Sequence, residues 1–393
     1  MSEQKRLCLN LGICGGCALG RMTYEEQLAA KEKEMKQLFE PVLGQDFFTD
    51  GRYEGMLESP RREAFRNKME YSFGNAQKDG PLNVGLHRHG RFFDIIEIPD
   101  CAVVHPDMNT VVQAAQNYFR GKGIPFVHKK SHEGILRHLV LRRSETTGDL
   151  LVNLVTVSGW QPEADWQEML LELPLCGRIS GILHTENDSL SDAVIPQRVT
   201  LQWGSPYLQE EILGLRFSLS PFSFFQTNTS GAAVLYGKVR EYVGGERDRT
   251  VFDLYSGTGT IAQLLAGTAR EVIGVEIVEE AVEAARNNAA ANGLTNCRFH
   301  AGDVLTCVDT LGTVPDVIVL DPPRDGVNPR ALSKIMRFGA QRLIYVSCKP
   351  KSLVRDIPML RLAGYEVTRL CLVDMFPFSA NCEAVACLDH AEG

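Results

Sequence analysis

The sequence predicts an α/β protein with a Rossmann-like C-terminal domain, preceded by a strand-rich central domain and a cysteine-rich N-terminal loop. From about Leu215 onward, short apolar runs alternate with helical patterns, which is typical of a parallel sheet covered by helices on both faces. Before that point, short β-type runs are separated by turns. Near the N-terminus, three of the eleven cysteines crowd into the Gly-rich segment Cys8–Cys17. We therefore expect three parts, at residues 1–45, 46–214 and 215–393.

A helix is expected directly after the cysteine-rich loop. Thr23 and Glu26 have the spacing of a capping box, and Pro41 is expected to stop the helix after Phe39. In the central part, the runs that predict strands are Phe92–Ile98, Leu139–Arg142 and Leu150–Val157.

The C-terminal part begins with a buried strand, a Gly-rich turn and a helix. The strand is Thr250–Leu254 and the helix starts at Ile261. A second strand, Glu271–Val275, ends in Glu276. The remaining elements follow in order: a helix at Glu279–Ala291, strands at Cys297–His300, Asp316–Leu320 and Arg342–Val346, and a final hairpin of Tyr365–Met375 and Glu383–Leu388.

Composition favours a cytoplasmic protein without a membrane segment. The hydrophobic fraction is 44% and the charged fraction 23%, as in ordinary globular proteins, and neither a membrane span nor a signal peptide is visible. A net charge of −8 argues against a general nucleic-acid binder. Residues 61–91, however, hold seven Lys/Arg against three acids, interleaved with aromatic residues. That mixture fits an RNA-binding surface, and it fits a solvated face over core aromatics equally well.

The Gly-rich turn after the first buried strand has the form of a nucleotide-cofactor loop. Its glycines, Gly257 and Gly259, allow a tight turn and close approach of a ligand. Glu276 lies 19 residues after Gly257, at the end of the next strand. A carboxylate there can accept hydrogen bonds from ribose hydroxyls, which serves NAD and S-adenosylmethionine equally well.

Two later strand ends favour S-adenosylmethionine. Asp303 ends the third strand, where a carboxylate could bind an adenine amino group. The segment Asp321-Pro322-Pro323 ends the fourth, and its paired prolines fix a rigid, extended exit. An enzyme that positions a planar base against a methyl donor can use such an exit, whereas a dehydrogenase has no particular use for it.

A thiol and a carboxylate at the same sheet edge would serve methylation of uracil at carbon 5. That carbon becomes electron-rich only after a thiolate adds to carbon 6, and a base must then remove the carbon 5 proton. Cys348 follows the strand Leu343–Val346 and is followed by Lys349 and Lys351, which favour the thiolate. Glu383 begins the last strand. A buried structural cysteine and a strand-edge glutamate are the alternative interpretations.

The N-terminal cysteines predict a metal cluster. Cys8, Cys14 and Cys17, with Cys101 as a distant fourth ligand, have the three-plus-one spacing of a [4Fe–4S] site. Zinc is the second possibility, although a zinc ribbon would need another Cys-x-x-Cys pair. The other six cysteines are expected to pack as small hydrophobic residues.

As a set, these motifs resemble the bacterial uridine-5 RNA methyltransferases, specifically the iron–sulfur branch that acts on 23S ribosomal RNA. The resemblance rests on motifs at both ends of the chain: the cysteine loop, Phe65-Arg66-Asn67-Lys68, Phe224-Phe225-Gln226-x-Asn228, Asp253-Leu254-Tyr255, Asp321-Pro322-Pro323-Arg324-x-Gly326, Ser347-Cys348 and Phe376-Pro377.

The resemblance implies a role for each matching residue. Cys348 would be the nucleophile and Glu383 the proton acceptor. The S-adenosylmethionine contacts would be Gln226, Tyr255, Thr260, Glu276, Asp303 and Asp321, and the cluster ligands Cys8, Cys14, Cys17 and Cys101. The substrate would be 23S rRNA. Apart from the resemblance, we expect a monomer, and we hypothesise that the target uridine is flipped out of its stack, because carbon 6 is unreachable in a stacked helix.

The chain departs from the family pattern at several positions. Ser256 replaces a usual Cys, Lys349 a common Asn, and Ser379–Glu383 lacks the His that usually precedes the base. Because only seven residues precede Cys8, we expect no separate N-terminal RNA-binding barrel, so the central domain would carry more of the RNA recognition.

Three alternatives stay open. The chain could methylate tRNA, it could be a non-catalytic iron–sulfur RNA-binding protein, or it could methylate an amino group through Asp321-Pro322-Pro323 alone.

Overall fold

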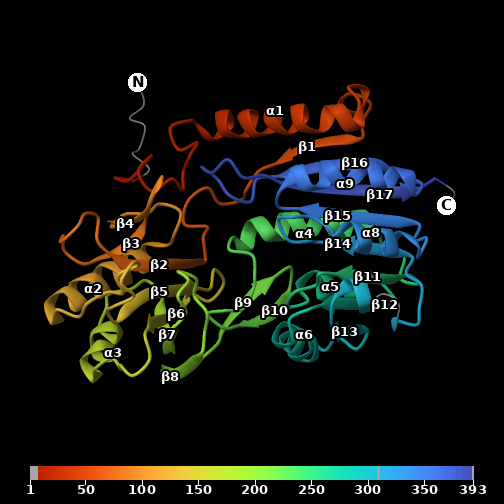
Figure 1. Cartoon of the computed structure of the whole chain (residues 1–393). Helices are drawn as coiled ribbons and strands as arrows, with labels where there is room; N and C mark the ends of the chain where they lie inside the picture. Colours follow the sequence, from red (N-terminus) through yellow and green to blue (C-terminus); the bar gives the residue numbers. More distant parts are fainter. Residues whose placement is uncertain (1–7, 308–309, 392–393) are drawn as a thin grey trace. The chain divides into compact units, whose positions relative to one another are not determined.

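The computed structural model describes residues 8–307 and 310–391, and their contacts divide the chain into two units (Figure 1). The first comprises residues 1–21, 61–210 and 218–222, and the second comprises residues 22–60, 211–217 and 223–393. The segment 1–45 is thus shared, because its loop belongs to the first unit and its helix to the second. Within the described residues, no helix combines the length and apolar character needed to cross a bilayer.

The first unit is built on a seven-stranded sheet with strand order β4-β3-β2-β5-β6-β7-β8. Its strands are β2 (Lys68–Gly74), β3 (Asn83–Arg88), β4 (Arg91–Glu97), β5 (Leu136–Arg143), β6 (Asp149–Thr156), β7 (Arg178–Glu186) and β8 (Arg198–Gly204). Only β6 and β7 pair in parallel. The three predicted runs fall on β4, β5 and β6, so the strand-rich character of this region is confirmed.

Two helices pack on one face of this sheet, and the sequence prediction missed both. They are α2 (Pro106–Lys122) and α3 (Ala164–Leu171). Val111, Phe119 and Trp166 of these helices form one core with Leu139 and Val152 of the strands. The start of α2 is marked by His105, whose side chain accepts from the Asp107 N–H, and by Pro106 in the first turn.

The second unit contains an eight-stranded mixed sheet with order β1-β16-β17-β15-β14-β11-β12-β13. Its strands are β1 (Tyr53–Leu57), β11 (Thr250–Leu254), β12 (Glu271–Glu276), β13 (Cys297–Ala301), β14 (Val317–Leu320), β15 (Arg342–Ser347), β16 (Tyr365–Val373) and β17 (Glu383–His390). β11–β15 are parallel, whereas β17 runs antiparallel to both β15 and β16. The predicted alternation and the closing hairpin are confirmed. β1, which pairs in parallel with β16, was not expected in this sheet.

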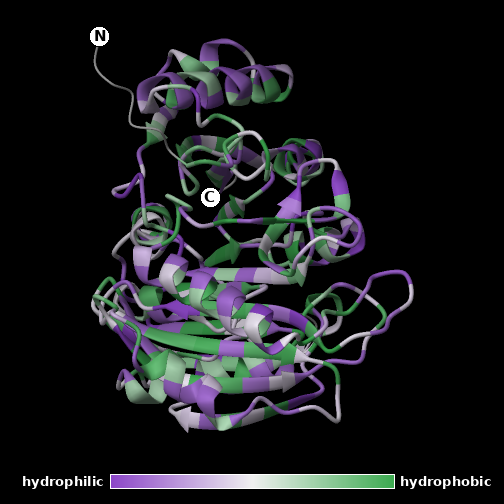
Figure 2. Ribbon diagram, turned by 90° about the vertical axis from the view of Figure 1, so that its left-hand side faces the viewer, coloured by the Kyte–Doolittle hydropathy of each residue, from purple (hydrophilic) through white to green (hydrophobic). Residues whose placement is uncertain are grey.

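Helices cover both faces of this sheet. α1 (Tyr24–Leu43), α7 (Val304–Cys307), α8 (Pro329–Met336) and α9 (Pro350–Leu362) share one apolar core with the strands. α4 (Thr229–Val243), α5 (Thr260–Leu265) and α6 (Glu279–Ala291) pack against strands as well. All residues of β11 and β14 are buried, as expected where both faces of a sheet are covered. Many strand residues of the molecule are hydrophobic and drawn in green in Figure 2. A two-stranded sheet of β9 (Leu208–Ile212) and β10 (Leu215–Leu219) completes the described strands.

Helix α1 confirms its predicted start and corrects its predicted end. The Thr23 side chain accepts from the Glu26 N–H, and the Glu26 carboxylate accepts from the Thr23 N–H, which is a complete capping box. The helix continues through Pro41 to Leu43, because Phe39 and Leu43 pack into the core and outweigh one lost hydrogen bond. Lys31 is buried in this helix and donates to Asp374 at 2.6 Å.

Candidate functional site

The carboxyl ends of the parallel strands bring the predicted catalytic pair together. Cys348 directly follows β15 and Glu383 opens β17. These strands are antiparallel, and Ser347 pairs with Ala384 in their register. The next pair along the register is therefore Cys348 and Glu383, so a thiol and a carboxylate stand opposite each other at the sheet edge.

Asp321 joins this pair from the neighbouring strand. It follows β14, which lies beside β15, and its N–H approaches the Leu254 carbonyl of β11. Burial, followed by the charge of Asp321, raises the pKa of Glu383 to about 8. Burial raises the pKa of the Asp321 carboxyl to about 7, although the residue as a whole is partly exposed. Arg324, from the same motif, opposes the rise at Glu383.

The ionisation of Cys348 differs from the sequence-based expectation. Burial, and then the charges of Glu383 and Asp321, raise the pKa of the thiol to about 11, and Arg324 offsets only part of this. The prediction that Lys349 and Lys351 favour the thiolate is therefore wrong for the ligand-free protein. The two carboxylates face the sulfur at the sheet edge, and α9 begins only at Pro350.

A tyrosine that sequence reasoning missed lies in the same site. Tyr236 of α4 is 5% exposed and hydrogen-bonded to the side chain of Gln226. Burial, and then the charge of Asp321, raises its pKa well above the usual range, and Glu383 and Asp253 contribute further. No local motif marks Tyr236. Its place depends on packing of α4 against strands that lie far along the chain.

The segment before α4 is fixed by Asn228. This residue caps the helix, accepting from the Gly231 N–H at 2.9 Å. Its amide nitrogen donates to the Met375 carbonyl at 2.8 Å and to Ser59 at 3.2 Å. These bonds tie the Phe224–Asn228 motif to the segment after β16, which holds Gln226 near Tyr236.

The Gly-rich turn forms a compact loop between β11 and α5. Tyr255 has a φ of 68°, which is unusual for a non-glycine residue. Asp253 is fully buried, and one carboxylate oxygen accepts from the Ala262 N–H at 2.9 Å, whereas the other has no partner among the described residues. Burial, followed by the charge of Asp321, raises the pKa of Asp253 to about 8. The hydrogen bond from the Ala262 N–H to the buried Asp253 carboxyl thus holds the loop against the start of α5.

Glu276 closes the loop from the neighbouring strand. Its carboxylate accepts from the N–H groups of Gly257, at 3.0 Å, and Val278, at 2.9 Å. Each oxygen keeps a second lone pair for a ligand hydroxyl. Ile277 and Val278 beside it are 66% and 48% exposed, so an apolar surface adjoins the carboxylate.

The two other predicted cofactor residues lie near the loop with different surroundings. Thr260 begins α5, is 7% exposed, and its hydroxyl lies 3.5 Å from that of Thr258. Asp303 is exposed after β13, and its carboxylate accepts from the Leu305 N–H at 2.9 Å. Thr258 in turn donates to the carbonyl of Phe224, whose ring is 69% exposed.

In the first unit, backbone contacts bring the cysteine loop to Cys101. The Leu9 N–H donates to the Asp100 carboxylate at 3.1 Å, and the Asn10 amide donates to the Glu97 carbonyl at 2.8 Å. Burial, and then the charges of Cys101, Cys14 and Cys8, raise the pKa of the Cys17 thiol to about 12. The four thiols therefore lie within electrostatic reach of one another.

The described part of the chain contains no group of three or more His, Cys, Asp or Glu arranged to hold a metal ion. The three thiols of the cysteine loop, together with Cys101, have the donor chemistry of a cluster site.

Comparisons with known proteins agree with this arrangement. Residues 246–366 match the model of a methyltransferase domain. An uncharacterized RNA methyltransferase of Clostridium tetani is 45% identical over 381 residues, covering 96% of this chain and 82% of the relative. One from Caldanaerobacter subterraneus is 43% identical and covers 99% of this chain and 86% of the relative. The crystal structure of Pyrococcus abyssi tRNA (uracil-54, C5)-methyltransferase in complex with S-adenosyl-L-homocysteine superposes with a TM-score of 0.77 at 27% identity, over 99% of this chain and 88% of that one.

The second unit thus has the class I, Rossmann-like methyltransferase fold. The sequence identity to the Clostridium tetani relative extends over 96% of the chain, so the family assignment applies to both units. The chain belongs to the RNA methyltransferases.

Proposed function

We propose that this RNA methyltransferase transfers a methyl group from S-adenosylmethionine to carbon 5 of uridine in 23S rRNA, through a covalent adduct with Cys348. The observation that carries the proposal is the pairing of Cys348 with the buried Glu383 across β15 and β17, beside Asp321. The Pyrococcus abyssi structure supports it, because that protein is named a uracil C5 methyltransferase and holds S-adenosyl-L-homocysteine.

Each residue of the pair has one chemical task. Cys348 adds to carbon 6 of uracil as a thiolate, after its proton has passed to solvent, which makes carbon 5 an electron-rich enolate carbon. Carbon 5 then takes the methyl group, for which S-adenosylmethionine would be the donor and S-adenosylhomocysteine the leaving group. Glu383 accepts the proton that carbon 5 still carries, the bond between sulfur and carbon 6 breaks, and 5-methyluridine leaves. The raised pKa of Glu383, about 8, makes its ionised form a stronger base than an ordinary carboxylate, which suits it to accept the carbon 5 proton.

Because the pKa of Cys348 is raised, the bound substrates must lower it before the thiolate can form. In the ligand-free protein the thiol is protonated at neutral pH, since its pKa is about 11. Positive charge brought into the site by the sulfonium donor would lower it. A filled cofactor site should therefore favour nucleophilic attack by Cys348. In the ligand-free enzyme the thiol keeps its proton and is a poor nucleophile.

The cofactor is proposed to lie over the Gly-rich loop. Glu276 would accept from the ribose hydroxyls, and Asp303 from the adenine amino group. The methionine end would lie near the other predicted contacts, which are Gln226, Tyr255, Thr260 and Asp321.

Transfer to tRNA is the second candidate. It is favoured by the structural similarity to a tRNA-modifying enzyme over almost the whole chain. By the family resemblance, ribosomal RNA is favoured by the set Cys8, Cys14, Cys17 and Cys101, which the tRNA-modifying branch typically lacks. The non-catalytic alternative is disfavoured by the intact pair of Cys348 and Glu383, and amino-group methylation would not require Cys348.

The test is methyl transfer from labelled S-adenosylmethionine to unmodified 23S rRNA and to bulk tRNA, with nucleosides identified after digestion. Wild type should place label in 5-methyluridine of rRNA, and Cys348→Ala should lose about 10³-fold or more. Cys387→Ala, which changes a buried cysteine four residues after Glu383 in β17, should retain transfer. Label in tRNA alone would overturn the rRNA assignment, and a fully active Cys348→Ala would overturn the covalent mechanism.

Cys8, Cys14, Cys17 and Cys101 are proposed to hold a [4Fe–4S] cluster. Their four thiols suit its ligand set, and their mutual effect on Cys17 supports their proximity. Its proposed role is to order the N-terminal loop rather than to carry electrons. Protein purified without oxygen should contain about four iron atoms and four sulfides per chain. Cys17→Ser should lose them, and Cys176→Ser, an exposed cysteine of the same unit, should keep them. Bound zinc in place of iron would contradict the proposal.

A further inference from the structure

The first unit contains a second site, separate from the proposed catalytic residues. It is a cavity of about 270 Å³ next to β5 and the loop that follows β7. Its walls combine apolar side chains, Phe73, Phe92, Val127 and Leu190, with polar ones, Lys129, His132, Arg137, His138, Ser191 and Asp192. The volume is just below the roughly 300–1,000 Å³ of typical ligand pockets, which suits one planar ring system rather than a long ligand.

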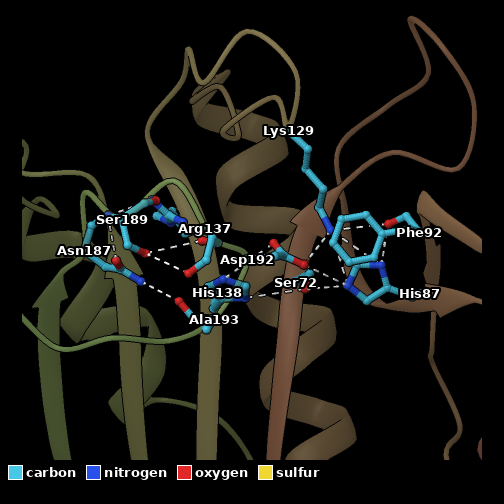
Figure 3. Close-up of polar contacts among 11 residues, drawn as sticks. Ser72, His87, Phe92, Lys129, Arg137, His138, Asn187, Ser189, Asp192 and Ala193 are labelled. Atoms are coloured by element: carbon cyan, nitrogen blue, oxygen red, sulfur yellow. Dashed lines mark hydrogen bonds and ion pairs between the residues drawn. The ribbon is translucent and has the colours of Figure 1, made fainter.

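Arg137 holds one wall of this cavity in place (Figure 3). Its guanidinium donates to the carbonyls of Asn187 at 2.9 Å, Ser189 at 2.7 Å and Ser191 at 2.6 Å. The Asn187 side chain donates further along the same loop, to Ala193, at 2.9 Å. The loop is therefore fixed by side-chain bonds, and the cavity is preformed rather than a gap between mobile segments.

Asp192 presents a charged edge to the cavity. One carboxylate oxygen lies 2.7 Å from the Lys129 ammonium and 3.2 Å from His87. The other lies 3.9 Å from Nε2 of His138, which is beyond hydrogen-bond distance. Although burial raises it, hydrogen bonds from His87 and Lys129 bring the pKa of Asp192 down to about 2, so the group is ionised at neutral pH.

His138 is the unsatisfied member of this cluster. It is 4% exposed, and its Nε2 has no hydrogen-bond partner among residues 8–307 and 310–391. Its other ring nitrogen lies 3.4 Å from the Ser72 hydroxyl. Burial lowers the pKa of His138 to about 4, so the ring is neutral at neutral pH. The Nε2 atom of His138 thus has hydrogen-bonding capacity left for an occupant of the cavity.

Phe92 offers an aromatic face at the mouth of the cavity. Its ring stacks on His87 with centroids 5.0 Å apart. The Lys129 ammonium lies 4.2 Å from the Phe92 centroid and within 3.5 Å of both His87 ring nitrogens, so it lies on the His87 side of the ring. The ring also contacts Phe93 edge-on, with centroids 5.6 Å apart, and Phe92 remains 55% exposed. Exposed aromatic faces next to cations bind unstacked bases.

We propose that this cavity binds one unstacked base of the RNA substrate, with a preference for guanine. The proposal rests on the proposed function in that RNA is the substrate. Guanine carries two neighbouring N–H donors beside a carbonyl oxygen. The Asp192 carboxylate would accept from the donors, Lys129 would donate to the carbonyl, and His138 Nε2 would gain a partner. Uracil, adenine and cytosine lack this pattern of two donors next to an acceptor.

The test measures binding of short labelled RNAs to the full-length protein by fluorescence anisotropy. The probes are single-stranded uridine heptamers whose central position is guanosine, adenosine, cytidine or uridine. The guanosine heptamer should bind about tenfold more tightly than the all-uridine one, since a good two-bond base contact typically gives that discrimination. Asp192→Asn should abolish the difference. Asp188→Asn, in the same loop but outside the cavity, should preserve it.

A second pair of variants does not depend on buried charge. Phe92→Ala changes an exposed residue and should weaken binding of the guanosine heptamer about tenfold. Tyr207→Ala, at a residue that is 53% exposed and does not line the cavity, should change it less than about twofold.

The proposal would be overturned by absent binding, by equal affinity for all four heptamers, or by equal effects within each variant pair. Methyl transfer measured on the same preparations separates this from the proposed function. Protein that forms 5-methyluridine without base discrimination contradicts the cavity proposal alone. Protein that discriminates guanosine but forms no 5-methyluridine contradicts the proposed function alone.

Discussion

Burial and neighbouring carboxyl groups at the edge of the second sheet determine the protonation states of Glu383 and Cys348 in the ligand-free protein. Glu383 is 3% exposed and next to a second carboxyl, Asp321, so its proton is held more tightly than in water. Cys348 in the same surroundings is held as a thiol. The site is therefore at rest until charged or planar ligands enter it. Both proposed steps, addition by Cys348 and deprotonation by Glu383, then depend on the charges of the same neighbours, Asp321 and Arg324.

Replacing the proposed proton acceptor should stop the reaction after methyl transfer. In Glu383→Gln, sulfur addition and methylation can proceed, but carbon 5 keeps its proton and the bond to Cys348 persists. We expect 5-methyluridine formation to fall by about 10²–10⁴-fold, the range of a lost general base. An RNA–protein adduct should accumulate on denaturing gels. The absence of any adduct, with full loss of transfer, would assign Glu383 to an earlier step.

The buried carboxyls also predict how stability depends on pH. The pKa values of Glu383 and Asp253, both about 8, exceed the values of about 4 expected in the unfolded chain. The folded protein thus keeps protons that the unfolded chain releases. Their stabilising contribution is complete below about pH 4 and is lost as pH rises towards 8.

Each such group contributes a slope of about 1.4 kcal/mol per pH unit across that window. Glu383→Gln cannot ionise, so its urea unfolding free energy should fall less steeply than that of wild type between pH 5 and 8. Glu279→Gln, at an exposed position, should keep the wild-type slope. Identical slopes for wild type and Glu383→Gln would contradict the raised pKa.

At the scale of elements, the junction between β11 and α5 depends on the close approach of α6 and β13. Gly259 has a φ of 71°, and a Cβ there would come within 2.5 Å of the Phe299 ring and 2.9 Å of Ala285. Gly257 also has positive φ, 54°, but its Cβ would meet only Phe224, at 3.8 Å. The two glycines share a backbone requirement, and only Gly259 also has a steric one.

This difference gives a matched pair of variants. Gly259→Ala should destabilise the protein by about 2–4 kcal/mol, from strain in the left-handed region together with overpacking. Gly257→Ala should cost about 1 kcal/mol, since backbone strain acts alone. Urea unfolding followed by circular dichroism measures both. Equal losses would show that contact with Phe299 and Ala285 does not restrict the turn.

At the scale of the whole molecule, sequence periodicity located most of the second sheet because most of its strands are buried and β11–β15 are each followed by a helix. It missed β1, since a five-residue strand far from β16 in the chain carries no sign of its partner. It missed α2 because α2 lies among strand-like runs. Motifs located Cys348 and Glu383, but Tyr236 was invisible to them, because only long-range packing brings it to Gln226.

Cofactor binding should stabilise the molecule as a whole by linkage. At about 100 times its Kd, S-adenosylhomocysteine should raise the free energy of unfolding by about 2.7 kcal/mol. Glu276→Ala should reduce this gain, because it removes the proposed ribose contact and the acceptor of the Gly257 N–H. Glu279→Ala, three residues further on, should retain it. An equal gain in both variants would contradict the proposed place of the ribose.

The covalent adduct is the central claim, and RNA containing 5-fluorouridine tests it most directly. Fluorine at carbon 5 cannot leave as a proton does, so the methylated adduct should be trapped on the enzyme in the presence of S-adenosylmethionine. After nuclease and protease digestion, mass spectrometry should find the modified nucleotide on the peptide that contains Cys348, and Cys348→Ala should give none. An adduct on another cysteine, or methyl transfer without any adduct, would contradict the account.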